Sequence, residues 1–261
     1  MKALPSLLLV VALWPSAGHA WPSDVHARQV TLATKLMPRA LRQQLKRHSD
    51  ELVRGATAPA LEATGHELNL NEGSGQLDAD AAELADKIVG MIRDQAEFAA
   101  VVHELGRLGH LVSDAAYPLN TSTSDAREPR YNADFGGYVT SKMGRFPPIF
   151  NGFTSPVGFD VRSYVRKVAE RANRRYPLVG AAYFPKADGP MRRSTAFDDR
   201  DPVFAVAQLS YIDGVTAVAN VWLHVWREAH GDLSEMPTLE QVQQQRGPCA
   251  TCPKSAAQRS R

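Results

Sequence analysis

Two side chains four residues apart, His110 and Asp114, carry the clearest chemical signal in the sequence. Apolar residues recur at intervals of three and four from Phe98 to Val112, which predicts a helix. Positions four apart on a helix lie on one face, a single turn from each other. An imidazole and a carboxylate placed in this way can hold a divalent cation, and zinc suits such mixed nitrogen and oxygen ligands. The sequence therefore predicts a metal site on this helix.

Pro118 is expected to end this helix and to turn the chain back toward the metal pair. Position 120 is then well placed for a further ligand, but the residue there is asparagine. An amide oxygen is neutral and is a poor zinc ligand beside an imidazole. Asn120 therefore predicts that part of the site has been lost.

The start of the chain predicts a secretory signal. Lys2 is followed by an apolar run from residue 7 to residue 14, and the small residues Gly18 and Ala20 stand at the two recognition positions for cleavage. Cleavage after Ala20 would export the protein to a periplasm or beyond, with Trp21 as its first residue. A free α-amino group has a pKa of about 8, so a nearby metal can displace its proton and use the nitrogen as a ligand. His26 follows five residues later as a second candidate ligand.

Composition narrows the function classes. The net charge is only +2 over 261 residues, which argues against a broad basic surface and against a stable nucleic-acid partner. Gly-x-Ser-x-Gly, phosphate-loop and dinucleotide motifs are absent from the sequence, which argues against serine hydrolases and nucleotide-binding folds. Cys249 and Cys252 lie together in a polar tail over 247–261, where a local disulfide is expected after export.

Helices are expected to position these groups, and no strand is predicted. The predicted helices begin at Asp24, at Arg39, at Asp78 or Asp80, near Phe98, at Asp160 and at Val203, with a short terminal one near Thr238. Loops are predicted over 54–76, 120–130 and 177–202, and an irregular aromatic cover over 131–156. The fold class is therefore all-α, a helical bundle with long ligand-bearing loops, formed as one domain over 21–246.

The helix that begins at Asp160 carries arginines along its outer face, at 162, 166, 171, 174 and 175. Such a basic face is usually solvated. The functional alternative is contact with phosphate or with anionic lipid head groups.

Together these features resemble the zinc-dependent phospholipase C and single-strand-specific zinc nuclease family. Its shared features are an amino-terminal tryptophan in the mature protein, a histidine soon after, and the segment His-x3-Asp-x5-His. Trp21 and His26 match the first two, and His110-Leu-Val-Ser-Asp114-Ala-Ala-Tyr-Pro-Leu-Asn120 matches the segment up to its last residue. The stretch from Val215 to Trp226 is similar to the closing helix of bacterial members. The resemblance covers most of the mature chain, with specific matches in two segments.

The resemblance implies a phospholipase C/nuclease-type helical bundle that uses three zinc ions to hydrolyse phosphodiesters. It implies that the amine and carbonyl of Trp21, with His26, hold one zinc. It implies that His66, His110 and an upstream aspartate hold a second, with the Asp114 carboxylate bridging the two ions.

The upstream aspartate has two possible positions. Asp50 stands sixteen residues before His66 and fits the nuclease-like spacing. The segment that ends at Ala60 is similar to the phospholipase pattern, in which case an alanine has replaced the ligand. Asp50 is the preferred ligand, and Asp114 and Asp50 are the carboxylates assigned to catalysis.

The ligands of the third zinc are where the sequence departs from the family. Their positions fall on Asn120, Asn132 and Gly136, none of which offers an imidazole or a carboxylate. One or two zinc ions are therefore expected instead of three. Turnover should fall by orders of magnitude unless nearby cations replace the third metal, and the candidates are Arg127, Arg130 and Lys142.

The sequence therefore predicts an exported zinc-dependent phosphodiester hydrolase, of phospholipase C type, that acts on a phospholipid or other phosphodiester and can contact a membrane surface. Two alternatives remain: a non-catalytic, zinc-stabilised binding protein of the same fold, and a nuclease-type phosphodiesterase.

Overall fold

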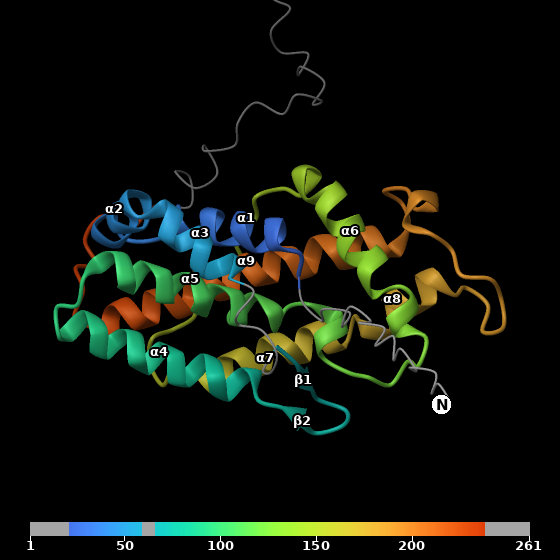
Figure 1. The fold of residues 1–261 in the computed structure, drawn as a ribbon, viewed down its shortest axis with the longest axis horizontal. Coiled ribbons are helices and arrows are strands. Elements are labelled where there is room, and N and C mark those ends of the chain that lie inside the picture. Colours follow the sequence, from blue (N-terminus) through green and yellow to red (C-terminus); the bar gives the residue numbers. More distant parts are fainter. Residues whose placement is uncertain (1–20, 59–65, 238–261) are drawn as a thin grey trace, which may run out of the picture.

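The structure is a computed structural model that describes residues 21–58 and 66–237 as a bundle of helices (Figure 1). The α-helices are α1 (Ser23–Thr34), α2 (Arg39–Arg47), α3 (Ser49–Thr57), α4 (Leu77–Arg93), α5 (Phe98–Asp114), α6 (Asn132–Lys142), α7 (Val161–Asn173), α8 (Tyr176–Tyr183) and α9 (Pro202–Glu228). Single 3-10 turns are η2 (Pro118–Asn120), η3 (Glu128–Arg130), η4 (Met143–Arg145) and η5 (Ser194–Ala196). The all-α prediction is confirmed.

Several predictions fall on residues that the structure does not describe. These are the signal segment over 1–20, Ala60, the terminal helix near Thr238, and the cysteine pair Cys249 and Cys252.

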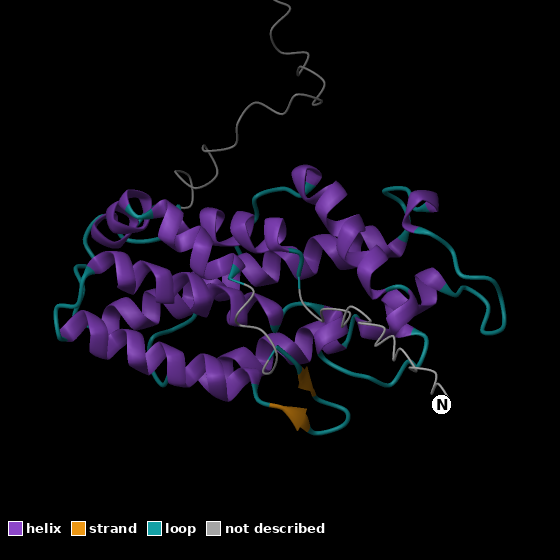
Figure 2. Ribbon diagram, in the orientation of Figure 1, coloured by secondary structure: helices purple, strands orange, loops and turns teal. Residues whose placement is uncertain are grey.

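One short hairpin interrupts the helical pattern, so the expectation of no strand was wrong at this place (Figure 2). Strand β1 (Leu68–Asn69) pairs antiparallel with β2 (Ser74–Gly75). Gly75 has a φ of +91°, and a Cβ there would lie 2.2 Å from the Glu67 carbonyl oxygen. Only glycine fits this turn, which lies between the end of the 59–65 segment and the start of α4.

Helices α5 and α9 form the centre of the bundle, with α1 and α3 against one side of α5 and α4 against the other (Figure 1). Gly55 in α3 and Gly106 in α5 allow these two helices to approach closely. A Cβ on Gly55 would lie 2.0 Å from the carbonyl oxygen of His103, and one on Gly106 would lie 2.3 Å from that of Leu52. This close contact brings the C-terminal end of α3 to the predicted ligands His110 and Asp114 on α5.

Helix α9 has 27 residues and is long and apolar enough to cross a membrane, with a mean hydropathy of 1.3 in its most apolar stretch. Inside the bundle, 72% of that stretch is buried, as expected for a core helix. Its one polar stripe is formed by Asp213, Thr216 and Asn220. Asn151 donates from its backbone to Thr216 (3.3 Å) and from its side chain to Asp213 (3.2 Å), while the Thr154 backbone donates to Asn220 (2.6 Å). These hydrogen bonds hold the segment around 151–154 against the outer face of α9.

The structure corrects four predicted segments, two of them near the N-terminus. The helix expected from Arg39 to residue 52 is divided at His48, whose φ of −110° and ψ of +36° separate α2 from α3. Residues 54–57, predicted as the start of a loop, belong to α3.

Helices α6 and α8 form where irregular structure and a loop were expected. In α6 the buried side chains of Phe135, Tyr138 and Val139 are three and four residues apart, and in α8 Tyr176 and Tyr183 are seven apart. Burial of these helical faces outweighs the unfavourable helix propensity of the glycines and proline in both segments.

The basic face of α7 is held in ion pairs. Arg166 donates to Asp78 at 2.7 Å and Arg162 lies 3.5 Å from the same carboxylate, while Arg175, just beyond α7, donates to Asp213 at 2.8 Å. Asp78, predicted as a possible helix cap, is 1% exposed and lies inside the first turn of α4. These arginines therefore neutralise buried carboxylates of the fold itself.

Candidate metal centre

Four nitrogen atoms from three separate parts of the chain converge on the Asp114 carboxylate, which is fully buried at the end of α5. Its Oδ1 lies 3.3 Å from the Trp21 backbone nitrogen and 3.3 Å from His26 Nε2. Its Oδ2 lies 2.9 Å from His66 Nδ1 and 3.2 Å from His110 Nε2. Each carboxylate oxygen therefore faces one pair of predicted ligands.

The nitrogen atoms come from elements that are far apart in the sequence. His26 is one turn into α1, and its ring stacks on that of His110 with centroids 3.8 Å apart. His66 follows the 59–65 segment, and its Nδ1 also lies 3.2 Å from His110 Nε2. His26, His110 and Asp114 present one ligand atom each within 4.8 Å of one another, a group that could hold a metal ion.

Hydrogen bonds to the far side of two rings determine which nitrogen carries the proton. His110 Nδ1 lies 2.8 Å from the Ala56 carbonyl oxygen, which can only accept, so Nδ1 is the donor. The Ser113 hydroxyl donates to the His110 carbonyl (3.0 Å) and accepts from His26 Nδ1 (2.9 Å). Both rings therefore direct an unprotonated Nε2 at Asp114, the arrangement that metal-binding histidines require.

The surroundings favour a neutral His26 ring beside an ionised carboxylate. Burial, together with the neighbouring His110, lowers the pKa of His26 to about 4, so this ring carries no charge at neutral pH. Burial alone would raise the pKa of Asp114, but its contacts with His110 and His26 hold that pKa well below its usual range.

His26 Nε2 is fully buried and has no hydrogen-bond partner among the described residues. It lies 3.3 Å from an acceptor oxygen with no proton between them, and a buried pair of acceptors is costly. A divalent cation bound by both atoms would remove that cost. The donor set of imidazole nitrogens and a carboxylate matches the ligands that zinc prefers.

Trp21 is fixed in place by its own side chain. Its indole Nε1 donates to the Ser113 carbonyl (2.8 Å), and its ring packs against that of Tyr117 at 4.6 Å. Pro22 follows and packs against α6, where a Cβ on Gly136 would lie 3.1 Å from the proline ring. These contacts hold the Trp21 backbone nitrogen against Asp114.

Asp50 is the one predicted metal ligand that the structure does not bring to this group. It lies exposed in the first turn of α3, whereas the same helix reaches His110 through Ala56, six residues or about 9 Å further along. Its assignments as a zinc ligand and as a catalytic carboxylate remain predictions that this geometry does not favour.

The three residues at the positions predicted for a third zinc make other contacts. Asn120 is fully buried, with its Nδ2 3.4 Å from the Asp114 carbonyl and its Oδ1 without a partner among the described residues. Asn132 accepts from the Tyr117 hydroxyl (3.0 Å) and donates to Glu128 (2.9 Å). Gly136 has no side chain, and the Pro22 ring lies against it.

Sequence reasoning missed Ser113 and Glu128. Ser113 is 87 residues from His26 in the sequence, and its hydroxyl determines the tautomer of that ring. It stands one position before the predicted ligand Asp114. Glu128 is 3% exposed and accepts from both Asn132 and the Tyr176 hydroxyl (2.7 Å). Ser113 occupies an unspecified position of the His-x3-Asp segment, so the motif gives it no role. Glu128 lies four positions before Asn132, a spacing that places both on one side of a helical turn.

The helices and the site together define a phospholipase C-like fold, as the resemblance implied. No protein-family profile matches the sequence, and no curated protein matches it in sequence. Solved structures do match: alpha-toxin from an avian strain of Clostridium perfringens has a TM-score of 0.62 and is 11% identical over 82% of this chain and 66% of its own. Alpha toxin from Clostridium absonum has a TM-score of 0.64 and is 12% identical over 82% of this chain and 67% of its own. The chain thus spans about two thirds of each toxin.

Proposed function

We propose that this protein is an exported, zinc-dependent phosphodiester hydrolase of phospholipase C type that works with at most two zinc ions. The observation that carries the proposal is the arrangement at Asp114, where each carboxylate oxygen faces one pair of nitrogen ligands. The fold shared with two clostridial alpha-toxins supports the phospholipase C type.

Each residue has a separate task in this proposal. Trp21 and His26 would hold one zinc, His66 and His110 would hold the second, and Asp114 would bridge them. Zinc bound here would act as a Lewis acid on a phosphoryl oxygen and would make water a stronger nucleophile at neutral pH.

Export matters because it changes the first ligand. With the leader attached, the Trp21 nitrogen is an amide that donates to Asp114. After cleavage following Ala20, the same nitrogen becomes an amine with a lone pair for the metal. The proposal therefore makes processing a condition for full metal content.

Among the three candidate cations, Arg130 is the one not held by a carboxylate in the described residues, so we assign it the role of the third metal. Arg127 is held by Asp125 at 2.8 Å, and Lys142 lies 3.6 Å from Asp199. Arg130 is exposed and stacks on the Phe184 ring at 5.0 Å, without a carboxylate partner in the described parts of the chain. Its planar guanidinium can bind a phosphate through two hydrogen bonds.

Metal content and turnover test the proposal. The mature protein, purified after export, should contain one or two zinc ions per chain and should release phosphorylated head group from a phosphatidylcholine emulsion faster than it cleaves single-stranded DNA. A content of zero or of three zinc ions would refute it. Faster cleavage of the DNA would assign the nuclease-type activity instead.

A second candidate function is favoured by the neutral residues at Asn120, Asn132 and Gly136. If the third metal is essential, the protein is a zinc-stabilised binding protein of the same fold. That candidate predicts bound zinc, a lower melting temperature after chelation, and no turnover on either substrate.

A further inference from the structure

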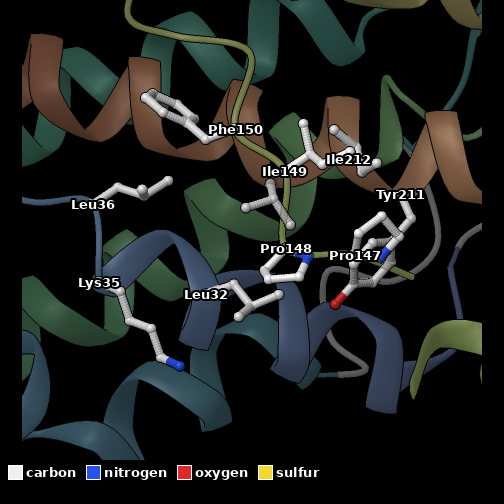
Figure 3. A pocket seen from close by; sticks show the side chains of 10 residues that line it. Leu32, Lys35, Leu36, Pro147, Pro148, Ile149, Phe150, Tyr211 and Ile212 are labelled. Carbon is white, nitrogen blue, oxygen red and sulfur yellow. The ribbon is translucent and has the colours of Figure 1, made fainter. Parts of the chain in front are cut away.

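An apolar slot lies on the outside of the bundle between α1, α9 and the chain segment that follows η4 (Figure 3). Leu32 from α1 faces Pro148 and Ile149 from that segment, and Ile212 from α9 forms the floor. None of the residues that line the slot belongs to the metal centre. The slot is therefore a separate feature of the fold.

The slot is a trough with one open side. Its interior holds about 40 Å³ of space, and the wider volume of about 460 Å³ between its walls includes open solvent. Ile149 is 42% exposed at its rim. An open trough with apolar walls matches the flank of an extended alkyl chain better than it matches a compact ligand.

One polar atom at the slot lacks a partner. Tyr211 is 2% exposed, and its hydroxyl has no hydrogen-bond partner among the described residues. Figure 3 shows this oxygen at the edge of the slot beside Pro148 and Leu32. Burial raises the pKa of Tyr211 to about 12, and the charge and the donor groups of the nearby Arg28 guanidinium oppose that rise. The hydroxyl is therefore a proton donor that lies next to a cation.

Two cations of α1 stand on the same side as the slot. Arg28, Leu32 and Lys35 are four and three residues apart, so they share one face of the helix. Neither Arg28 nor Lys35 has a carboxylate partner in the described residues, unlike the paired arginines of α7. The apolar slot thus has a hydroxyl donor and two uncompensated positive charges on its α1 side.

We propose that this slot binds the monomer of a single-chain amphiphile with an anionic head, of the fatty acid class. The alkyl chain would lie between Leu32 and Ile149. The carboxylate would accept from the Tyr211 hydroxyl and from the Arg28 guanidinium, with Lys35 as a second charge. The proposal is independent of the proposed hydrolase function, because it uses no metal ligand.

Calorimetry with the full mature chain and dodecanoate, below the concentration at which micelles form, tests the proposal. One dodecanoate should bind per chain. Dodecanol, with the same tail and no charge, should bind about tenfold more weakly, and dodecyltrimethylammonium should not bind measurably. Decanoate should bind several-fold more weakly than dodecanoate because two methylene groups are lost.

Two variants locate the site. Ile149→Asp places a charge on the rim of the slot and should abolish dodecanoate binding, while Val157→Asp, on the same segment but 88% exposed and outside the slot, should leave it unchanged. Arg28→Gln should weaken binding about tenfold. Each variant should keep its melting temperature and zinc content, which separates this test from that of the hydrolase.

Three results would overturn the proposal. These are no saturable binding of dodecanoate, equal binding of dodecanol and the cationic amphiphile, and binding that survives Ile149→Asp. Attachment to neutral phosphatidylcholine vesicles in place of monomer binding would also overturn it, and would identify the slot as part of a membrane-contacting face.

Discussion

The two halves of the predicted three-metal site use their buried polar atoms in opposite ways. Around Asp114, the unprotonated Nε2 atoms of His26 and His110 face carboxylate oxygens, and His26 Nε2 has no hydrogen-bond partner among the described residues. Around Asn132, each donor meets an acceptor, from the Tyr117 hydroxyl through the amide to Glu128. The first half needs a cation to complete it, and the second is completed by its own hydrogen bonds.

This difference explains how a metal site can be lost without loss of the fold. Replacing a ligand alone would leave its buried neighbours unpaired, at a cost of about 1–3 kcal/mol for each group. Here the amide of Asn132 makes two hydrogen bonds, with Tyr117 and Glu128, and Gly136 lies against Pro22. The packing of Pro22 also helps to hold Trp21 at Asp114, so the loss in one half supports the geometry of the other.

The largest effect is expected from Asp114→Asn, which removes the charge shared by both nitrogen pairs. Zinc content should fall to background, and hydrolysis of phosphatidylcholine should fall at least about a hundredfold, since even loss of a residue that only supports a ligand costs 10–100-fold. Elemental analysis and a head-group release assay measure the two effects. Asp134→Asn is the control, because that carboxylate is bound by Tyr183 and Ser194. Retention of two zinc ions by Asp114→Asn would contradict the comparison.

A single extra residue before Trp21 should remove one zinc ion and leave the other. The added peptide bond converts the terminal amine into an amide, while His66 and His110 keep their contacts with Asp114. Native mass spectrometry of the extended and mature chains counts the ions directly. The same residue added at the C-terminus serves as the control, and equal zinc content in all three chains would argue against the amine as a ligand.

Ser113→Ala should weaken zinc binding by about 10–100-fold without changing the fold, because His26 loses the acceptor that keeps its proton on Nδ1. Competition with a chelator reports the change in affinity. Ser210→Ala removes a buried hydroxyl on α9 that accepts from Arg175 and should leave zinc affinity as it is. Identical chelator curves for all three proteins would show that the tautomer is determined in another way.

The smallest effect on metal is expected from Glu128→Gln, which tests the hydrogen-bonded half. The new amide group faces the donors Asn132 Nδ2 and Tyr176 OH, so the free energy of unfolding should fall by about 1–3 kcal/mol. Zinc content should not change. Urea titration measures the first and elemental analysis the second, with the exposed Glu170→Gln as control. Loss of zinc from Glu128→Gln would place this region back inside the metal site.

The most accurate predictions rested on local sequence patterns. The four-residue spacing of His110 and Asp114 is preserved on α5 because helix geometry fixes it, and the apolar periodicity located α1, α4, α5, α7 and α9. The meeting of Trp21, His26 and His66 at Asp114 depends on how separate elements pack, and only the family resemblance indicated it.

What sequence reasoning missed depends on tertiary contact. Gly55 was assigned to a loop, but it is a point of close contact between α3 and α5. Helices α6 and α8 contain glycine or proline and become helical because burial of their aromatic faces outweighs propensity. The exposure of Asp50 likewise follows from the orientation of α3, which spacing to His66 does not determine.

The polar stripe of α9 also affects the free energy of inserting this helix into a lipid bilayer. Before the other helices surround it, α9 presents a hydrophobic length typical of a segment that inserts into lipid. Asp213 stands near its middle, where a charge raises the free energy of insertion by about 2.5–3.5 kcal/mol. The side chains that bind the segment around 151–154 therefore also disfavour insertion of α9 into a bilayer before the fold is complete.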